Sequence, residues 1–317
     1  MFRWLLLQAS RSRTLRRWVP RLPPVRRAVQ RFMPGEELEA ALAAAAELEA
    51  GGAPTILTFL GENVDDAASV EEVVGEYGAA LGSIRARGLN MEISVKPTQL
   101  GMDVDGSLCR AALDELARAA AAAGVCLWID MEDSSYVDRT LEAYRELRSR
   151  HRDVGVCLQA YLHRTPDDLE ALLPLDPAIR LVKGAYREPA SAALQRRTAI
   201  DRRFGELGET LLQWRRRSPG TRVAFGTHDE SLVEQLTGRA RTLELPATAL
   251  EFQLLYGIRT DLQARLVRAG TPARVLISYG EAWYPWYVRR LAERPANLLF
   301  VLGSLVPKGR WRHRGET

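Results

Sequence analysis

Several short apolar segments of this chain end in a charged residue suited to catalysis or ligand binding. Lys96 and Asp130 each close one such segment, and Arg180 and Lys183 lie in another. Only three of the 44 basic residues are lysines, so two lysines at these positions are informative. A cation placed there could bind an anionic group of a substrate. A lysine could instead form a Schiff base, as in an aldolase, or extend outward to solvent.

A second basic site lies near the end of the chain, where Arg289 and Arg290 precede Glu293. On a helix, Glu293 would lie one turn away from both arginines and could orient their guanidinium groups. Two oriented arginines suit the carboxylate of a ligand, and the alternative is an exposed ladder of ion pairs.

His228 is the only histidine expected at the end of a strand, so we predict no metal site.

The elements that position these residues alternate regularly along the chain. Eight short apolar runs, spaced by about 30 residues, are typical of strands. They cover residues 55–60, 92–96, 125–130, 154–161, 179–184, 222–227, 248–253 and 273–279. Amphipathic segments between them, such as 70–86, 107–123 and 136–149, are typical of helices. This order predicts an α/β protein folded as a (β/α)8 barrel of the TIM type.

In such a barrel the carboxyl ends of all strands meet on one face, where active sites form. Every predicted strand ends in polar or flexible residues, which packing alone does not explain, and the set predicts an enzyme that binds a small anionic substrate. Lys96 and Asp130 end neighbouring strands, so we expect an ion pair between them. The other residues of the ring are Gly61, Glu62, Asn63, Glu132, Asp133, Gln159, Tyr161, Gly184, Tyr186, Thr227, His228, Asp229, Glu251, Gln253, Tyr256, Tyr279 and Gly280.

Charge is distributed unevenly along the chain. The net charge is +4, but residues 1–35 hold nine arginines and no acid, which leaves 35 basic and 40 acidic residues, or −5, on the remainder. Residues 15–22 and 25–32 are typical of two short amphipathic helices, and a further helix is expected over 36–50. We predict a basic helical arm over 1–52, a barrel over 53–305 and a basic tail over 306–317. The arm is either a solvated surface or a contact to an anionic membrane, and its pattern does not favour nucleic acid.

The cysteine pattern and the lack of targeting signals indicate the compartment. Cys109, Cys126 and Cys157 are odd in number and form no CxxC pair, which argues against disulfide bonds and for a reducing compartment. No apolar stretch approaches the roughly 18 residues that a membrane span needs. The apolar start at residues 4–7 is shorter than a signal-peptide core of about 7–15 residues. We expect a cytoplasmic protein, with the arm as its candidate contact to the inner face of the cytoplasmic membrane.

Seven motifs occur in an order that is specific, although each motif alone is weak. They are Ser94-Val95-Lys96, Ile129-Asp130-Met131-Glu132, Leu158-Gln159-Ala160-Tyr161, the segment 180–186, Thr227-His228-Asp229, Leu255-Tyr256-Gly257 and the segment 289–293. In this order they resemble the proline dehydrogenase family at strands 2–8, and Gly61-Glu62 matches its first strand. The resemblance covers roughly residues 25–305.

The resemblance implies a flavoenzyme that oxidises L-proline to Δ1-pyrroline-5-carboxylate by hydride transfer to FAD, the first step of proline catabolism to glutamate. It also implies a distorted barrel, a membrane quinone as electron acceptor and a pyrroline-5-carboxylate dehydrogenase acting downstream. Arg180 would lie near the flavin N5, and Asp130 would lie beside the substrate. The other residues implied at the substrate are Lys96, Tyr186, Leu276, Arg289, Arg290 and Glu293, and those implied at the flavin are Met131, Gln159, Lys183, Gly184, Ala185, Thr227 and His228.

The chain departs from the family pattern at one position of the last strand. Leu276 stands where the family usually has a tyrosine that contacts the substrate, so the pocket loses a hydroxyl and gains an apolar wall. Hydroxyproline or another cyclic or secondary amino acid therefore stays open as the substrate. A Schiff-base lyase or aldolase, using Lys96 or Lys183, also stays open, as does a non-enzymatic protein that binds a membrane surface.

Overall fold

The computed structural model describes residues 29–284. Within them, Met33–Glu281 form a compact unit that contains every strand, and this unit is described by itself. The arm before residue 29 and the tail lie outside the described residues, so the predicted division into arm, barrel and tail stays a prediction. Three residues expected at the substrate, Arg289, Arg290 and Glu293, also lie outside the described residues.

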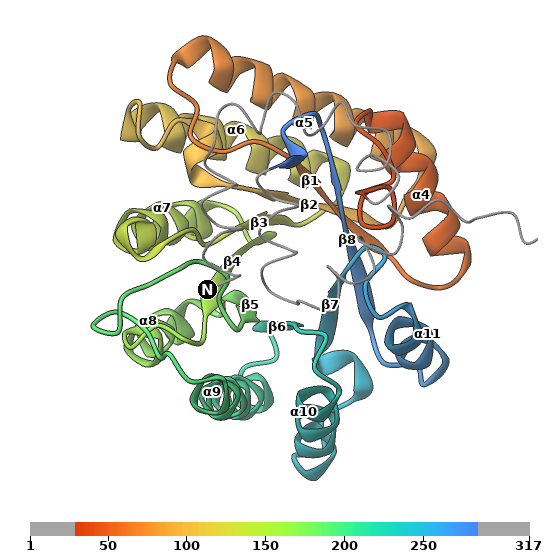
Figure 1. The fold of residues 1–317 in the computed structure, drawn as a ribbon, viewed down its shortest axis with the longest axis vertical. Coiled ribbons are helices and arrows are strands. Elements are labelled where there is room, and N and C mark those ends of the chain that lie inside the picture. Colours follow the sequence, from red (N-terminus) through yellow and green to blue (C-terminus); the bar gives the residue numbers. More distant parts are fainter. Residues whose placement is uncertain (1–28, 285–317) are drawn as a thin grey trace, which may run out of the picture. The chain divides into compact units, whose positions relative to one another are not determined.

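The strands of this unit form a closed barrel in which every neighbouring pair is parallel. β1 pairs with both β2 and β8, and this second pairing, with Ile56 opposite Leu276, closes the barrel (Figure 1). The (β/α)8 barrel predicted from the alternating pattern is confirmed. The strands are β1 (Thr55–Phe59), β2 (Met91–Val95), β3 (Leu127–Ile129), β4 (Val154–Gln159), β5 (Ala178–Val182), β6 (Arg222–Gly226), β7 (Glu251–Leu255) and β8 (Ala273–Tyr279).

Seven of the eight strands differ from their predicted bounds by one to three residues, and only β8 has the predicted bounds. Two of the differences have a clear local cause. β7 begins at Glu251 rather than at residue 248, because Ala247–Ala249 form a 3-10 turn before the strand. β3 is three residues long, because Val125 still belongs to the turn after the preceding helix, where its N–H donates to the Ala120 carbonyl. The shift of β7 places Gln253 in the middle of that strand, inside the barrel wall, rather than at its end.

Helices surround the barrel (Figure 1). The predicted helices over 36–50, 70–86, 107–123 and 136–149 correspond to α4–α7. In α5, Asp66 caps the start by accepting a hydrogen bond from the Ser69 N–H at 2.7 Å, and Gly88 ends the helix with a φ of 64°. The helices are α4 (Leu38–Ala50), α5 (Ala67–Arg87), α6 (Gly106–Ala123), α7 (Val137–Arg150), α8 (Thr165–Leu172), α9 (Arg197–Arg217), α10 (Glu230–Thr242) and α11 (Thr260–Arg268).

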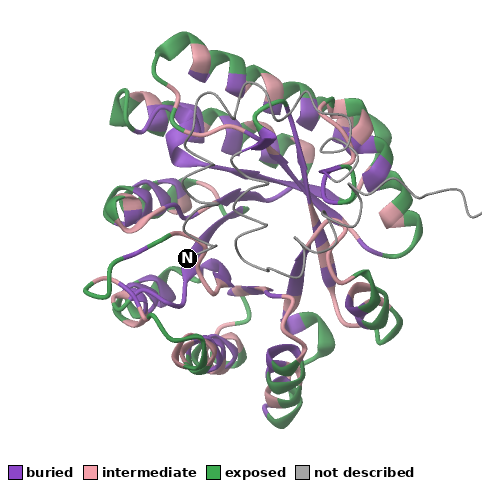
Figure 2. Ribbon diagram, viewed as in Figure 1, coloured by how far each residue is buried: buried purple, intermediate pink, exposed green. Residues whose placement is uncertain are grey.

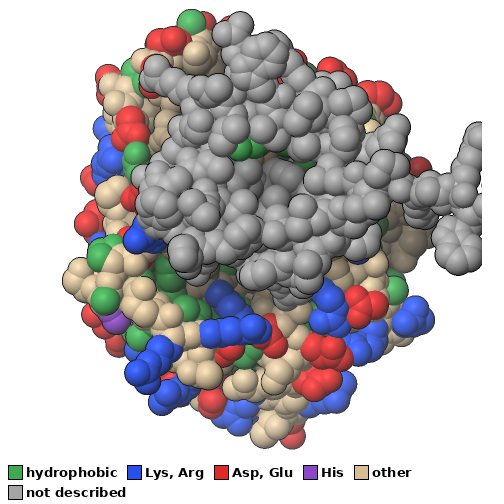
Figure 3. All heavy atoms as spheres, viewed as in Figure 1, with side chains coloured by type: hydrophobic (Ala, Val, Ile, Leu, Met, Phe, Trp, Pro, Cys, Tyr) green, Lys and Arg blue, Asp and Glu red, His purple; other side chains and the backbone are tan. Residues whose placement is uncertain are grey.

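The barrel wall is buried, whereas the helices expose their outer faces (Figure 2). α4 packs against β1 and β8. On the face shown in Figure 3, basic and acidic side chains are interspersed over the helices, and pairs such as Arg239–Glu209 and Arg265–Glu230 join neighbouring helices. Among residues 29–284, no helix combines the length and the apolar character needed to cross a membrane.

Candidate active site

Arg180, on β5, is buried inside the barrel, and its side chain is 5% exposed. Its Nη1 donates to Asp130 Oδ1 at 2.7 Å and to Ser94 Oγ at 2.9 Å. Its Nε donates to Gln253 Oε1 at 2.5 Å, and the guanidinium carbon lies 4.6 Å from the centre of the Trp128 ring. The two residues predicted to be catalytic, Asp130 and Arg180, are thus brought together as an ion pair.

One nitrogen of the Arg180 guanidinium lacks a hydrogen-bond partner among the described residues. Within the part of the chain that the structure describes, Nη2 is buried and has no hydrogen-bond partner. Leaving a buried donor unsatisfied costs about 1–3 kcal/mol, so such groups almost always have a partner. An acceptor atom of a bound ligand would satisfy this donor. The flavin ring that the resemblance implies beside Arg180 carries acceptor nitrogens, so the residues present fit that cofactor.

The expected ion pair between Lys96 and Asp130 is wrong. Lys96 follows β2 and is largely buried, but the Asp130 carboxylate pairs with Arg180, and no ion pair between Lys96 and Asp130 is found among residues 29–284. The reason is that Arg180 reaches across the barrel interior from β5 and, together with Ser94, occupies Asp130 Oδ1.

A second polar cluster fastens the segments that follow β1, β2 and β3. The Glu132 carboxylate accepts hydrogen bonds from the Thr98 N–H at 2.9 Å and from Thr98 Oγ1 at 2.6 Å. Thr98 Oγ1 in turn accepts from the Asn63 N–H at 3.2 Å. Gln159, expected at the cofactor, donates from Nε2 to the Glu132 carbonyl at 2.7 Å. Sequence reasoning missed Thr98, because it lies in the 3-10 turn Pro97–Leu100 beyond the end of the strand.

The pH dependence of folding should report the burial of Glu132. Burial raises the pKa of this carboxyl from 4.5 to about 7, although the Thr98 hydrogen bonds and the Lys96 charge lower it. Between these two values the unfolded chain releases a proton that the folded protein keeps, so stability falls as the pH rises. The contribution is about 3 kcal/mol in total. Relative to the parent protein, Glu132→Gln should therefore become more stable by this amount between pH 4.5 and pH 8, measured by urea unfolding.

The control for this prediction is Glu72→Gln, which removes one negative charge from the exposed surface of α5. The substitution also changes packing and hydrogen bonding at every pH, which adds a constant offset, so only the trend with pH is diagnostic. A constant difference between Glu132→Gln and the parent protein over the whole range would contradict the prediction.

Two residues expected at the cofactor, Lys183 and His228, are held by side chains and backbone near the ends of β5 and β6. Lys183 Nζ pairs with Asp229 at 2.8 Å and also with Asp201. His228 Nε2 accepts a hydrogen bond from the Leu255 N–H at 2.9 Å, so the proton of the neutral ring is on Nδ1. Both carboxylates contact the amine that a Schiff-base lysine must present to its substrate. This pairing argues against Lys183 as a Schiff-base residue.

The segment after β5 requires glycine at one position. Gly184 has a φ of 115°, and a Cβ there would lie 2.3 Å from the ring of Tyr161. Only glycine therefore allows the backbone to lie against this ring. The Tyr161 hydroxyl donates to the Tyr186 carbonyl at 3.4 Å. Ala185 and Tyr186 are half-buried at the strand-end face, where a ligand could contact them.

Three further predicted residues, Met131, Thr227 and Leu276, lie on the same face or inside the barrel. The placement of Glu251 on this face was wrong, because β7 begins at Glu251 and its side chain therefore lies at the opposite end of the barrel. Met131 and Thr227 are buried directly after β3 and β6, and Thr227 Oγ1 accepts from the Asp229 N–H at 3.1 Å. Leu276 lies within β8 and packs against a cluster inside the barrel that includes Trp128. Among residues 29–284, no group of three or more His, Cys, Asp or Glu side chains is arranged to hold a metal ion.

Comparison with known proteins decides the family. The sequence profile described as Proline dehydrogenase matches residues 41–302, well over half of the chain. The chain belongs to the proline dehydrogenase family. Proline dehydrogenase 1 of Bacillus subtilis strain 168 is 33% identical to it, over 97% of this chain and 100% of that protein. The proline dehydrogenase of Deinococcus radiodurans is 35% identical, over 87% of this chain and 89% of that protein.

Family membership confirms the prediction made from the ordered motifs and makes the protein an oxidoreductase of the proline dehydrogenase class. It sets aside the lyase and the non-enzymatic interpretations. Solved structures agree on the fold. Proline utilization A (PutA) from Bdellovibrio bacteriovorus, inactivated by N-propargylglycine, has a TM-score of 0.79 at 22% identity, over 89% of this chain and 34% of that chain. This chain thus spans about a third of that longer protein, and at this identity the likeness shows the fold alone.

Proposed function

We propose that this protein oxidises L-proline to Δ1-pyrroline-5-carboxylate with FAD as its cofactor, as the first step of proline catabolism. The match to the proline dehydrogenase family over residues 41–302 supports the reaction. The buried and unpaired Nη2 of Arg180 is the structural observation that supports a flavin at this position. When bound, FAD would supply the two-electron oxidation by taking a hydride from the carbon next to the substrate nitrogen.

In this proposal Arg180 would stabilise the negative charge that develops on the flavin when it accepts the hydride. Asp130, Ser94 and Gln253 hold its guanidinium in place before the reaction begins, so no reorganisation is needed at that moment. The ion pair with Asp130 also keeps the positive charge inside the barrel, where the local dielectric constant is lower than in water. Each of these contacts is made by a buried or half-buried side chain, which favours one fixed geometry.

The substrate amine must be neutral before it can be oxidised, and cations close to it lower its pKa. We propose that Lys96 and Arg180 act in this way, with Asp130 beside the substrate. The family pattern assigns the substrate carboxylate to Arg289 and Arg290, oriented by Glu293, and assigns Tyr186 and Leu276 to the pocket wall. The proposed flavin contacts are Met131, Gln159, Lys183, Gly184, Ala185, Thr227 and His228.

Anaerobic bleaching of the flavin tests this proposal. The purified protein, as isolated or after reconstitution with FAD, should show flavin absorbance that L-proline bleaches in the absence of oxygen. A colourless protein that cannot be reconstituted with FAD would overturn the proposal. The same assay with hydroxyproline and other cyclic amino acids tests the substrate. If one of these amino acids bleached the flavin faster than L-proline does, that amino acid would be the preferred substrate.

Leu276→Tyr should raise kcat/KM for L-proline, because a tyrosine hydroxyl at this position would restore a hydrogen bond that the family pattern implies. One hydrogen bond contributes about 0.5–1.5 kcal/mol, or roughly a 2- to 10-fold gain. Leu276→Phe is the matched control, since it adds the same ring without the hydroxyl. Equal gains in both variants would show that the effect comes from the ring. A loss in Leu276→Tyr would show that the pocket is built around leucine, in agreement with the packing of Leu276 against the cluster inside the barrel.

We further propose that the reduced enzyme passes its electrons to a membrane quinone, and that residues 1–32 of this otherwise cytoplasmic protein contact the membrane surface. The nine arginines in residues 1–35, without any acid, support contact with anionic lipid. A pyrroline-5-carboxylate dehydrogenase would then consume the product.

Deletion of residues 1–24 should weaken binding to vesicles that contain anionic lipid, and should leave turnover with a soluble dye unchanged. Sedimentation with such vesicles measures the first effect, and neutral vesicles are the control. Equal sedimentation of the full chain and the truncated chain would dismiss a membrane role for the arm.

A further inference from the structure

A chain of hydrogen bonds runs from Arg180 toward the opposite end of the barrel. Gln253, on β7, is 5% exposed, and its Oε1 accepts from Arg180 Nε at 2.5 Å. Its Nε2 donates to Glu251 Oε1 at 2.7 Å. Glu251 and Gln253 are two residues apart on one strand, so their side chains lie on the same face of the sheet. The proposed function as stated explains the position of Arg180 but not why Gln253 contacts it.

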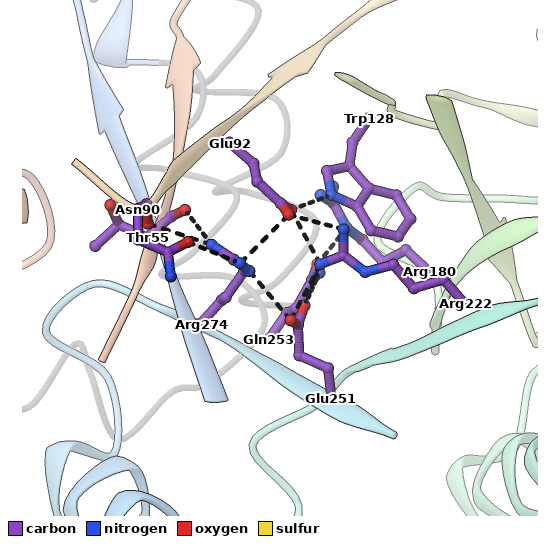
Figure 4. Close-up of polar contacts among 9 residues, drawn as sticks. All are labelled: Thr55, Asn90, Glu92, Trp128, Arg180, Arg222, Glu251, Gln253 and Arg274. Carbon is purple, nitrogen blue, oxygen red and sulfur yellow. Dashed lines mark hydrogen bonds and ion pairs between the residues drawn. The ribbon is translucent and has the colours of Figure 1, made fainter. Parts of the chain in front are cut away.

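Glu251 belongs to a group of charges at the amino ends of β2, β6, β7 and β8 (Figure 4). Its carboxylate accepts from Arg222 Nη2 at 3.0 and 3.1 Å and from Arg274 Nε at 3.1 Å. Both arginines also pair with Glu92, at 2.7 and 3.4 Å, and Glu92 accepts from Trp128 Nε1 at 2.7 Å. Arg222 and Arg274 therefore hold Glu251 in place, and Glu92 and Trp128, whose ring lies beneath the Arg180 guanidinium, support the two arginines.

The ionised state of Glu251 decides how Gln253 is oriented. Burial would raise the pKa of the Glu251 carboxyl, but attraction to Arg222 and Arg274 outweighs burial and keeps this pKa below its ordinary value. An ionised carboxylate accepts hydrogen bonds and donates none. The side-chain amide of Gln253 must therefore turn its NH2 group toward Glu251, which leaves its oxygen facing Arg180. The reverse orientation would place one donor against another at Arg180 Nε.

With Gln253 in this orientation, the Arg180 guanidinium is held at every nitrogen except Nη2. Nε is held by Gln253, Nη1 is held by Asp130 and Ser94, and one face lies on Trp128. The Nη2 edge is then the one that a ligand can use. Without an acceptor at Nε, the guanidinium could rotate and present a different edge, while its charge would stay nearby.

We propose that Gln253 is a positioning residue for Arg180, held in its orientation by Glu251. The inference rests on the proposed function, in which Arg180 lies beside the flavin. Gln253 touches neither substrate nor flavin in this proposal and acts through the guanidinium alone. It should therefore affect the oxidation step and the properties of the flavin more than the binding of proline.

Gln253→Met tests the inference, because methionine keeps the length of the side chain and removes the acceptor. In the enzyme loaded with FAD we expect kcat for L-proline to fall by about 10- to 100-fold, the range for a lost supporting contact or a displacement of about 1 Å, with little change in KM. The midpoint potential of the bound flavin should become more negative, because a displaced cation stabilises the reduced form less well. A role in folding alone would not move the potential.

Gln253→Glu should recover most of the lost activity and potential. A carboxyl group that donates its proton to Glu251 still offers an oxygen to Arg180, and two carboxyls in such contact share a proton readily. Gln213→Met is the matched control, since Gln213 makes the same kind of contact, from Nε2 to Glu209 at 3.0 Å, on the outer helix α9. It should leave kcat and the potential unchanged.

A double-mutant cycle with Arg180→Met isolates the link between the two residues. If Gln253 acts through Arg180, Gln253→Met should have no further effect on the potential once Arg180 is replaced. Should Gln253→Met fail to fold, Glu251→Gln tests the same link, because it lets the Gln253 amide reverse and should lower kcat and the potential in the same direction.

The outcomes separate this inference from the proposed function. Failure of the parent protein to bind FAD or to be bleached by L-proline refutes the proposed function. A parent protein that passes, together with a Gln253→Met variant of unchanged kcat and potential, overturns the inference alone. Additive effects of Gln253→Met and Arg180→Met overturn it as well, since they would show that Gln253 acts independently of Arg180.

Discussion

Arg180→Met is expected to lower kcat for L-proline by about 100- to 1,000-fold, the range for losing one preorganised group that stabilises a developing charge. The expectation rests on the burial of the guanidinium and on its contacts to Asp130, Ser94 and Gln253, which fix it before substrate arrives. The measurement is the steady-state reduction of a soluble dye by the enzyme loaded with FAD, with the midpoint potential of the flavin as a second readout.

Two further variants serve as controls for the Arg180→Met result. Arg180→Lys keeps the charge but not the planar group with its several donors, so it should recover a small part of the activity. Arg239→Met removes an arginine that pairs with Glu209 at 2.7 Å on the outer helices, and it should leave turnover unchanged. Turnover of Arg180→Met within a few-fold of the parent enzyme would rule out a catalytic role for Arg180. Thermal unfolding of each variant shows that a loss of activity is not a loss of folded protein.

The barrel was predictable from sequence because parallel strands covered on both faces are almost continuously apolar. β4, β5 and β8 match this pattern closely, and β8 was predicted with its observed bounds. The pattern is weaker where a strand begins next to a turn. At β7, the apolar residues before Glu251 extended the prediction into a segment that folds as a 3-10 turn.

The residues inside the barrel were harder to predict, because their partners are distant in sequence. Glu92 and Arg222 are separated by 130 positions and pair within the barrel. In the sequence, each of these two residues has the properties of a solvent-facing charged residue at the start of a strand. The ion pair of Arg180 with Asp130 was missed for the same reason, since neighbouring strands suggested Lys96 as the partner. Side-chain length and the closure of the barrel, neither of which is a local pattern, decide these contacts.

Glu92→Gln is expected to lower the free energy of unfolding by about 3 kcal/mol, the low end of the range for removing one member of a buried ion pair. The Glu92 side chain is 8% exposed and accepts hydrogen bonds from Arg222 and from Trp128. A glutamine amide has one acceptor oxygen and a donor group, so one of these donors would face another donor. The low end of the range applies because Arg222 is 32% exposed and keeps its contact with Glu251.

Glu39→Gln is the control, because it removes the acid of an exposed ion pair and so separates the effect of burial from that of losing a charge. Glu39 pairs with Arg87 at 2.6 Å, but the two side chains are 71% and 41% exposed, and such surface pairs contribute little. Urea unfolding of both variants at one pH measures the difference. High salt should change the stability of the Glu39 pair more than that of the Glu92 pair, because solvent ions screen exposed charges more effectively. Equal and small losses in the two variants would mean that water reaches Glu92, and that the charges at the base of the barrel do not hold Glu251 and Gln253 in place.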